Sequence, residues 1–366
     1  MDKPRATGPG SAEPNTPRAA DPGAAPRGYR TSDFDYALPP EQIAQHPLPD
    51  RSASRLLVLD RAGAGTRHLH FRDLPELISP GDLLVINTSR VIPARLRGKR
   101  EGGQDAEFLV VREIEDGTWL AMAHPGGKLK PGRRVTIGAD SAIEIVEVLG
   151  GGLRRVRFVG ALDGGGTIAK YGEVPLPPYI RRPPVSADRE RYQTVYATHD
   201  GSVAAPTAGL HFTTELLAQI HERRILVTAL DLHVGPGTFK PVETDTLEQH
   251  TMHPEAYEIA PGAASGINHN RGKVWAVGTT VVRALESAAD AQGQVRAGAA
   301  ETSLFIRPPY DFKVVNHLIT NFHLPRSTLL MLVCAFGGYE RVMAAYREAV
   351  QKGYRFYSYG DAMLIV

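Results

Sequence analysis

The sequence contains 13 histidines, and imidazole is a side chain that binds metal ions and moves protons near neutral pH. Three groupings could bind a metal: His68 with His70, His250 with His253, and the set His211, His233 and His323. Neither an HExxH motif nor a pair of cysteines accompanies them. Because dispersed histidines are more often hydrogen-bonded or catalytic than zinc-binding, we expect no required metal.

A glycine and a threonine connect a predicted strand to a predicted helix. The strand expected over 274–277 runs into Gly278 and Thr279, so free amides at the helix start would face a polar or anionic ligand group. A role of Thr279 as a helix N-cap is the ordinary alternative. Further along the same helix, Arg283 and Glu286 are three residues apart and share a face. Spacing alone favours an exposed ion pair between them.

Two other segments place small residues beside a histidine. A strand predicted over 225–232 ends in the loop His233–Phe239, where Gly235 and Gly237 leave the backbone open to a flat ligand. Upstream, Ala205–Phe212 combines small residues with a histidine directly before a helix. For this second segment, a helix-capping turn with a structural histidine is the competing interpretation.

The elements that position these residues change character along the chain. Short β-branched runs separated by Gly- and Pro-bearing turns predict a small antiparallel barrel or sandwich; they are 83–86, 108–111, 119–122, 143–148 and 156–158. After a Pro-dense connector at 171–184, strands alternate with helices, which predicts an α/β domain with ligands at the carboxyl ends of strands. The expected strands are 225–232, 274–277, 304–306 and 363–366, and the expected helices are 214–224, 280–289, 327–336 and 340–351.

Composition limits the classes of function. The 366 residues carry 42 Lys and Arg against 40 Asp and Glu, so the net charge of +2 gives no global attraction to nucleic acid, and any RNA-binding surface must be local. Candidate basic clusters are 95–100, 128–134 and 154–157, although interspersed acidic residues fit a solvated strand face equally well. The single cysteine, Cys334, lies in an apolar run and predicts a buried, reduced core residue.

Neither terminus indicates a membrane segment. No apolar run reaches the length of about 20 residues that spans a bilayer, so we expect no membrane association and a cytoplasmic location. Residues 1–30 are rich in Pro, Gly, Ala and Arg without periodicity, which predicts a disordered extension.

Seven long segments, in this order, resemble the S-adenosylmethionine:tRNA ribosyltransferase-isomerase family of queuosine biosynthesis. They are Asp82–Arg97, Arg191–Ala197, Ser202–Thr213, Leu232–Phe239, Val277–Glu286, Thr320–Val333 and Tyr354–Ile365. The resemblance runs from about Phe34 to the C-terminus. It implies an α/β main domain with an inserted antiparallel β-barrel domain, for which we expect 31–90 with 160–366 as the catalytic domain and 91–159 as the insertion.

The resemblance also implies a reaction. Such enzymes act on tRNA that carries 7-aminomethyl-7-deazaguanine at the wobble position, forming epoxyqueuosine and releasing adenine and methionine. S-adenosylmethionine would be a co-substrate, and no permanently bound cofactor is expected. The sulfonium acidifies the C5′ protons, so a base can form an ylide that expels adenine. The amine of the modified base then attacks C1′, and epoxide closure releases methionine.

Residues in the matching motifs receive roles by this resemblance. Proton transfer would fall to His211, His233 or His323, and Glu286 would steer the sulfonium or the ribose hydroxyls. Arg283 would bind the methionine carboxylate. The S-adenosylmethionine pocket would be shaped by Thr207, Gly209, Gly235, Gly237, Gly278 and Thr279. Contacts with tRNA would come from Arg90, Arg95, Lys128 and Arg181.

Two other classes of function remain. One is a non-catalytic RNA- or nucleotide-binding protein that kept the fold and lost turnover, and the other is a nucleoside-cofactor transferase with a small-molecule acceptor. Intact histidine motifs favour an enzyme, and the basic clusters favour RNA as the acceptor. We expect a monomer.

Overall fold

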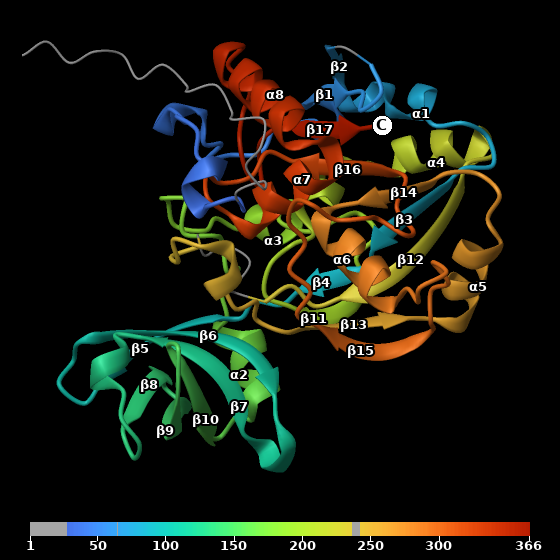
Figure 1. The fold of residues 1–366 in the computed structure, drawn as a ribbon. Coiled ribbons are helices and arrows are strands. Elements are labelled where there is room, and N and C mark those ends of the chain that lie inside the picture. The colour runs from blue at the N-terminus through green and yellow to red at the C-terminus, as the bar shows by residue number, and fades with distance from the viewer. Residues whose placement is uncertain (1–27, 64, 236–241) are drawn as a thin grey trace, which may run out of the picture.

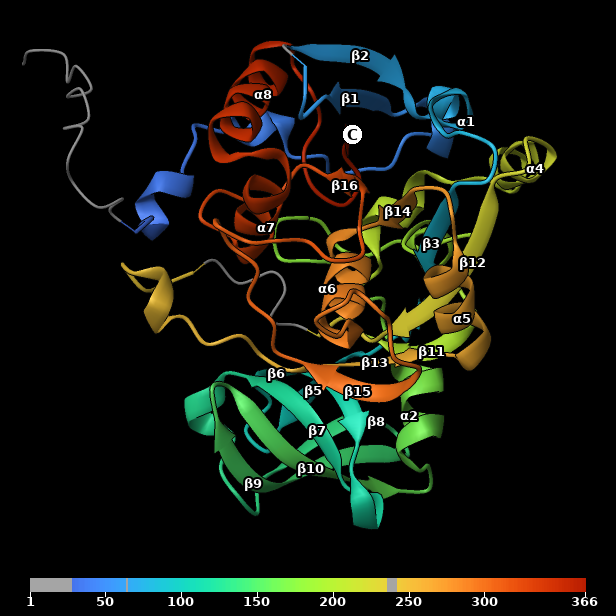
Figure 2. The ribbon, with the colours of Figure 1, turned by 45° about the vertical axis from the view of Figure 1, so that its right-hand side comes forward.

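The computed structural model describes residues 28–63, 65–235 and 242–366 (Figure 1). A body built on a large mixed sheet is joined to a separate lobe of antiparallel strands, which lies beside β13 and β15 in both ribbon views (Figures 1 and 2). Most of the expected N-terminal extension, residues 1–27, falls outside the described residues. Tyr29 already belongs to the fold, because its ring packs against Phe34 and Tyr339.

The body is organised by a nine-stranded sheet with the order β15-β13-β12-β3-β14-β16-β17-β1-β2. In chain order the strands are β1 (Arg55–Leu59), β2 (Thr66–His70), β3 (Leu83–Asn87), β12 (Leu226–Leu232), β13 (Glu255–Ile259), β14 (Val274–Val277), β15 (Gly298–Thr302), β16 (His317–Asn321) and β17 (Ala362–Ile365). The adjacent strands β12, β3, β14 and β16 run parallel. Their carboxyl ends therefore meet at one edge of the sheet, where open α/β sheets bind ligands.

Strand side chains alternate between two apolar layers, as a period of two requires. Leu83 and Val85 pack on one face of the sheet, whereas Leu84 and Ile86 pack on the other. The first face is covered by α5 (Pro261–His269), α6 (Thr279–Ala288), α7 (Thr328–Gly337) and α8 (Tyr339–Gln351), and the second by α1 (Leu74–Leu77) and α4 (Thr214–Glu222). The sheet is thus the middle layer of three, and Cys334 is buried in the first helical layer, as predicted.

The lobe consists of six antiparallel strands in the order β10-β7-β6-β5-β8-β9, and pairing of β9 with β10 closes the ring. Its strands are β5 (Arg95–Arg100), β6 (Asp105–Glu113), β7 (Trp119–His124), β8 (Arg134–Gly138), β9 (Ser141–Gly150) and β10 (Leu153–Gly160). Helix α2 (Gly164–Tyr171) contributes Ile168 and Tyr171 to the apolar interior of this lobe. Strands β4 (Ser89–Val91) and β11 (His199–Ser202) form a short parallel pair next to it, and α3 (Asp188–Arg191) follows the connector.

The expected mixed α/β fold with an antiparallel insertion is confirmed at this level, and the run at 83–86 is a strand. Its grouping with the antiparallel runs is wrong, and so is the strand expected at 304–306. Residues 83–87 form β3 at the centre of the large sheet, because a strand covered by helices on both faces is a continuous apolar run. Residues 304–306 are irregular: the carbonyl of Leu304 accepts a hydrogen bond from the buried Arg283 instead of joining a sheet. In the described part of the chain no single helix has the length and apolarity to cross a membrane, and α7 with α8 meets that test only as a pair bent by 116°.

Candidate active site

A cavity lies where the parallel strands end, and loops from distant parts of the sequence line it. The segments 205–208, 278–280, 320–324 and 357–358 form most of its wall, and the space measures about 620 Å³, part of it open to solvent. Tyr179 from the connector, Val234 after β12 and Leu329 of α7 also line it. Segments from three of the matching motifs, at 205–208, 278–280 and 320–324, therefore meet at the carboxyl ends of the parallel strands.

Gly278 and Thr279 stand at the junction of β14 and α6 on the cavity wall. Gly278 is the N-cap residue of α6 and has φ 97°, a conformation that residues with a Cβ rarely adopt. No side chain caps this helix end, and Thr279 is the first helical residue rather than the cap. The first-turn amides of α6 therefore lack intrahelical acceptors and can serve a ligand.

Two polar atoms in the cavity wall are buried without a hydrogen-bond partner among the described residues. They are Oδ1 of Asn321, at the end of β16, and Oγ1 of Thr280, in the first turn of α6. Leaving a buried acceptor or hydroxyl unpaired costs about 1–3 kcal/mol, so such atoms mark places that a bound ligand would satisfy.

His211 lies behind this wall with both ring nitrogens hydrogen-bonded. The ring closes a short helical turn, Thr207–His211, and stacks on Phe71 with 4.9 Å between centroids. Ser54 donates to a backbone carbonyl, so its Oγ accepts from Nδ1 of His211 at 2.6 Å, while Nε2 accepts from Asn321. Burial, followed by repulsion from Arg51 and Arg355, lowers the pKa of His211 to about 3. The imidazole is thus neutral and held in one tautomer.

His323 does line the cavity, directly after β16. Its Nε2 lies 2.7 Å from Oγ1 of Thr320, and burial lowers the pKa of His323 to about 3. Its backbone is fixed as well, since its amide donates to the hydroxyl of Tyr346. A histidine with this pKa is a weak base at neutral pH, although it can donate or accept a hydrogen bond to a ligand.

A second, larger cleft of about 2670 Å³, much of it open to solvent, lies between the body and the six-stranded lobe. Trp119 and Met122 of the lobe line it together with His250 and His253 of the body. It adjoins the first cavity, because Val234 and Leu329 belong to both walls.

His233 lines this second cleft, directly after β12. Its Nδ1 is buried, and neither ring nitrogen has a hydrogen-bond partner in the described part of the chain. Gly201 leaves room for the ring, since a Cβ at that position would lie 2.7 Å from it. Of the three histidines, His233 is the one whose ring is not already committed to a structural hydrogen bond.

Arg283 and Glu286 do not pair with each other. Arg283 forms a buried ion pair with Glu255 and donates to the carbonyls of Leu304 and Thr302. The carboxylate of Glu286 instead accepts hydrogen bonds from the backbone amides of residues 313–315 at 2.9–3.2 Å. Arg283 lines the larger cleft, but its charge is neutralised by Glu255. Glu286 lines neither the smaller cavity nor the larger cleft, as far as the described residues show.

The glycines expected to shape the pocket have different environments. Gly235 lies in the larger cleft and its amide donates to Glu255 at 3.0 Å. A Cβ on Gly209 would collide with the hydroxyl of Tyr196 at 2.2 Å, so Gly209 permits packing behind the wall. Gly237 falls outside the described residues. Thr207, Gly278 and Thr279 are the predicted pocket residues that do line the cavity.

Of the four basic residues that we expected to contact tRNA, two lie in one groove and two lie elsewhere on the surface. Arg95 and Arg181 line one groove of about 1090 Å³, together with Arg97, Arg182 and Arg189. Arg90, by contrast, donates to the carbonyl of Ala197 and lies 3.9 Å from Asp200, and Lys128 is exposed at a turn of the lobe. The structure brings Arg95 and Arg181 together and leaves Arg90 and Lys128 apart from them.

Comparison with known proteins places this geometry in a family. Residues 31–365 match the family model described as queuosine biosynthesis protein. The chain belongs to the queuosine biosynthesis protein family. The protein named S-adenosylmethionine:tRNA ribosyltransferase-isomerase from Moorella thermoacetica is 50% identical, over 92% of this chain and 100% of that protein. The protein of the same name from Anaeromyxobacter sp. strain Fw109-5 is 52% identical, over 92% of this chain and 99% of that protein.

A solved relative supports the same placement. The crystal structure of S-adenosylmethionine tRNA ribosyltransferase from Thermotoga maritima is 37% identical and matches with a TM-score of 0.53, over 92% of this chain and all of that chain. The queuosine biosynthesis fold therefore extends over the body and the lobe, not over one of them alone.

For this member of the queuosine biosynthesis family, sequence reasoning missed Asn321 and Thr280. Both stand in segments that carried the resemblance, Thr320–Val333 and Val277–Glu286, but neither residue type alone indicates a ligand contact. Each has a buried polar atom without a hydrogen-bond partner among the described residues, and such a feature is visible only in the three-dimensional structure. Among the described residues no group of three or more His, Cys, Asp or Glu side chains is arranged to hold a metal ion.

Proposed function

We propose that this protein transfers and isomerises the ribosyl group of S-adenosylmethionine onto 7-aminomethyl-7-deazaguanine at the tRNA wobble position, yielding epoxyqueuosine-tRNA, adenine and methionine. One observation carries the proposal within this family. A cavity at the carboxyl ends of the parallel strands contains polar atoms that have no partner among the described residues. It adjoins a cleft lined by His233, whose ring bonds no residue of that same part of the chain.

S-adenosylmethionine occupies the smaller cavity in this proposal. Oδ1 of Asn321 accepts a hydrogen bond from an N–H or O–H group of the nucleoside, and Oγ1 of Thr280 makes a second contact. The first-turn amides of α6 bind a polar or partly negative group of the ligand. The rings of Tyr179 and Tyr357, with centroids 4.6 Å apart, supply apolar surface for the adenine.

His233 is the group we assign to proton transfer. A general base must be free to accept a proton, and His211 and His323 are neutral, buried and hydrogen-bonded, with pKa values lowered to about 3. His233 directly precedes Val234 in the chain, and Val234 lines both the smaller cavity and the larger cleft. His211 acts as a positioning residue, and His323 contributes hydrogen bonding in the cavity.

The modified base enters through the larger cleft, where Trp119 of the lobe faces His250 and His253 of the body. Flat bases stack on aromatic and imidazole rings, which is the usual mode for unpaired nucleotides. We propose that the closed six-stranded sheet with α2, over about residues 91–171, is a barrel domain that holds the anticodon stem-loop against the body. The arginine-lined groove with Arg95 and Arg181 binds backbone phosphates, because Arg181 is exposed without a side-chain partner in the described part of the chain.

The decisive experiment uses purified protein, S-adenosylmethionine and tRNA that bears the aminomethyl base. We expect stoichiometric release of adenine and methionine, and a mass increase of the wobble nucleoside that corresponds to the epoxycyclopentanediol group. A protein that binds both substrates but releases no adenine would instead be a binding protein that has lost turnover. Adenine release with a small amine in place of tRNA would indicate a different acceptor. We expect the active species to be a cytoplasmic monomer.

A further inference from the structure

A smaller hollow of about 280 Å³, part of it open to solvent, lies behind the proposed S-adenosylmethionine cavity, and Ser358 belongs to both walls. Its lining includes two arginines, Arg51 and Arg191, next to His211 and Tyr359. Arg51 begins a short helical turn, Arg51–Ala53, and Arg191 ends α3, so residues far apart in sequence bring two cations to one small space.

The two guanidinium groups have only neutral partners. Arg51 donates to the carbonyls of Leu210 at 3.1 Å and Glu190 at 2.9 Å. Arg191 donates to the carbonyls of Pro49 at 2.8 Å and Leu48 at 2.6 Å, and its Nε is buried without a partner among the described residues. Within that same part of the chain, neither arginine lies within 4.0 Å of a carboxylate, in contrast to the partly buried Arg55, Arg95 and Arg182.

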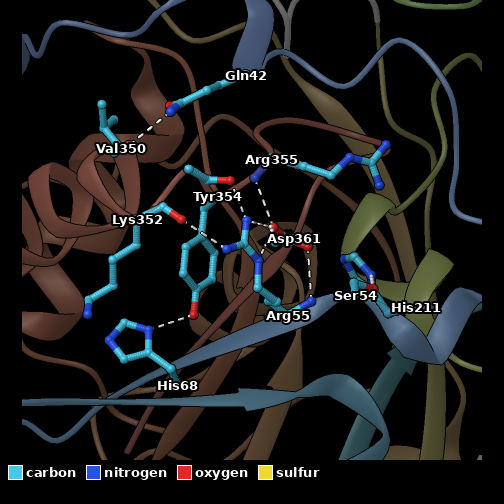
Figure 3. Close-up of polar contacts among 11 residues, drawn as sticks. Gln42, Ser54, Arg55, His68, His211, Val350, Lys352, Tyr354, Arg355 and Asp361 are labelled. Atoms are coloured by element: carbon cyan, nitrogen blue, oxygen red, sulfur yellow. Dashed lines mark hydrogen bonds and ion pairs between the residues drawn. The ribbon is translucent and has the colours of Figure 1, made fainter.

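Among the described residues, the positive charges around this hollow are only partly compensated. Burial and then repulsion by Arg191 lower the pKa of Arg51, and the opposing effect of Glu190 is smaller than either. Of the nearby carboxylates, Asp188 binds Arg182 and Asp361 binds Arg55. Glu190 and Asp50 act on Arg51 and Arg191 only from beyond ion-pair distance. Arg355 adds a third positive charge: its side chain extends toward Ser54 and His211 in Figure 3, and its NH1 is buried without a partner in the described residues.

We propose that this hollow is the carboxylate site for the methionine part of S-adenosylmethionine, with Arg51 and Arg191 as its ligands. The inference rests on the proposed function, and it transfers the carboxylate role from Arg283, whose charge Glu255 neutralises. An oxyanion here offsets the repulsion between two partly desolvated guanidinium groups and satisfies the buried Nε of Arg191.

The hollow favours a carboxylate of the cofactor over a phosphate of tRNA. Its lining includes the buried residues Ser54 and His211, and its volume is less than half that of the adjoining cavity. The carboxylate is covalently part of S-adenosylmethionine, so it can extend from the cavity past Ser358 into the hollow. A phosphate of tRNA is flanked by two sugars, which would have to enter the same small space.

The test compares S-adenosylmethionine with its decarboxylated analogue, which has the same sulfonium and nucleoside but lacks the carboxylate. Calorimetric titration without tRNA should show that the wild-type protein binds the analogue about 10- to 100-fold more weakly, the range for losing hydrogen bonds to a charged group. In Arg191→Met the preference should shrink to about threefold or less, because affinity for S-adenosylmethionine falls while affinity for the analogue stays. Arg191→Lys, which keeps the charge, should recover part of the preference.

Arg271→Met is the matched control, since Arg271 is exposed directly before β14, at the opposite edge of the sheet. It should retain the full preference. Thermal unfolding of each variant checks that it is folded, and Arg51→Met replaces Arg191→Met if the latter is not. A wild-type protein that binds both compounds equally, or an Arg191→Met variant with undiminished preference, overturns the proposal. A raised KM for tRNA with unchanged binding of S-adenosylmethionine overturns it in favour of a phosphate site. Absence of any adenine release by the wild type would contradict the proposed function instead.

Discussion

Nδ2 of Asn321 lies 3.1 Å from Nε2 of His211 and 3.1 Å from the carbonyl oxygen of Tyr357. Because that carbonyl can only accept, the amide orientation is fixed, and Oδ1 is the atom left in the cavity wall without a partner among the described residues. His211 is fixed in turn by Ser54 at its other nitrogen. In the proposed function, His211 therefore holds the amide of Asn321 so that Oδ1 points to the ligand, instead of acting as the base.

Removing that acceptor should weaken cofactor binding. Asn321→Ala is expected to raise the Kd for S-adenosylmethionine about 10-fold, because it deletes the hydrogen bond from Oδ1 and frees the ring of His211. Calorimetric titration measures the effect. Asn270→Ala is the control, since Asn270 bonds the carbonyl of Gly272 at the opposite edge of the sheet and should leave the Kd unchanged. Equal affinities for the two variants would remove Asn321 from the binding site.

The two buried histidines predict a pH dependence of stability. Both have folded-state pKa values near 3, below the ordinary value of 6.5, so the unfolded chain takes up their protons first as the pH falls. Stability is complete above about pH 6.5 and declines toward pH 3 by about 1.4 kcal/mol per pH unit for each histidine. Urea unfolding at pH 7 and pH 5 should differ by about 4 kcal/mol from these two groups. In His323→Gln that difference should be roughly halved, and an unchanged difference would show that His323 is not buried neutral.

A third prediction separates His233 from the other histidines. His233→Gln should lower kcat about 100-fold or more, the usual cost of losing a general base, and remove the limb of the pH–rate profile that reports it. Because its ring nitrogens bond no described residue, the free energy of unfolding should change by less than about 1 kcal/mol. His269→Gln, at an exposed residue that ends helix α5, is the control. A kcat within threefold of wild type would return the assignment to His211 or His323.

Local sequence patterns gave the elements that carry the site, but not the partners of their side chains. The strand at 274–277, the turn at Gly278 and the helix after it were predictable because apolar runs, glycine and helix periodicity are local signals. By contrast, Arg283 and Glu286 share a helix face, and spacing favoured their pairing, yet each binds a group 15 or more residues away in sequence. Long-range partners leave no trace in a local pattern.

The antiparallel lobe shows the same limit. The predicted runs match β6, β7, β9 and β10, whereas β5 and β8 were missed because Arg95–Arg100 is nearly all polar and Arg134–Gly138 is short. The run that forms β3 was grouped with the lobe strands on its pattern alone, because it resembles the other apolar runs and comes before them, whereas the resemblance placed 31–90 in the catalytic domain. Burial in β3 is continuous, whereas β6 alternates between buried and partly exposed residues, which is the difference between a central parallel strand and a strand with one wet face.

The arginine-lined groove leads to a prediction about tRNA. Arg181→Glu should raise the KM for tRNA about 10-fold at physiological salt and make binding less dependent on salt, because one phosphate contact is lost. Affinity for S-adenosylmethionine should not change. Arg223→Glu makes the same charge change at the exposed end of α4 and should have a much smaller effect. If both variants weaken tRNA binding equally, the effect is one of net charge and the groove is not the site.

The buried pair of Arg283 and Glu255 provides a test of the role that the resemblance gave to Arg283. Arg283→Met should destabilise the fold by about 3–5 kcal/mol, because it leaves the carboxylate of Glu255 buried without its cation. Adding Glu255→Gln removes that charge and keeps an acceptor for the amide of Gly235, so the double variant should recover a large part of the loss. The Kd for S-adenosylmethionine should stay within threefold of wild type in the double variant. A Kd raised more than 10-fold, with stability restored, would show that Arg283 contacts the cofactor after all and would remove the reason for assigning the carboxylate to Arg51 and Arg191.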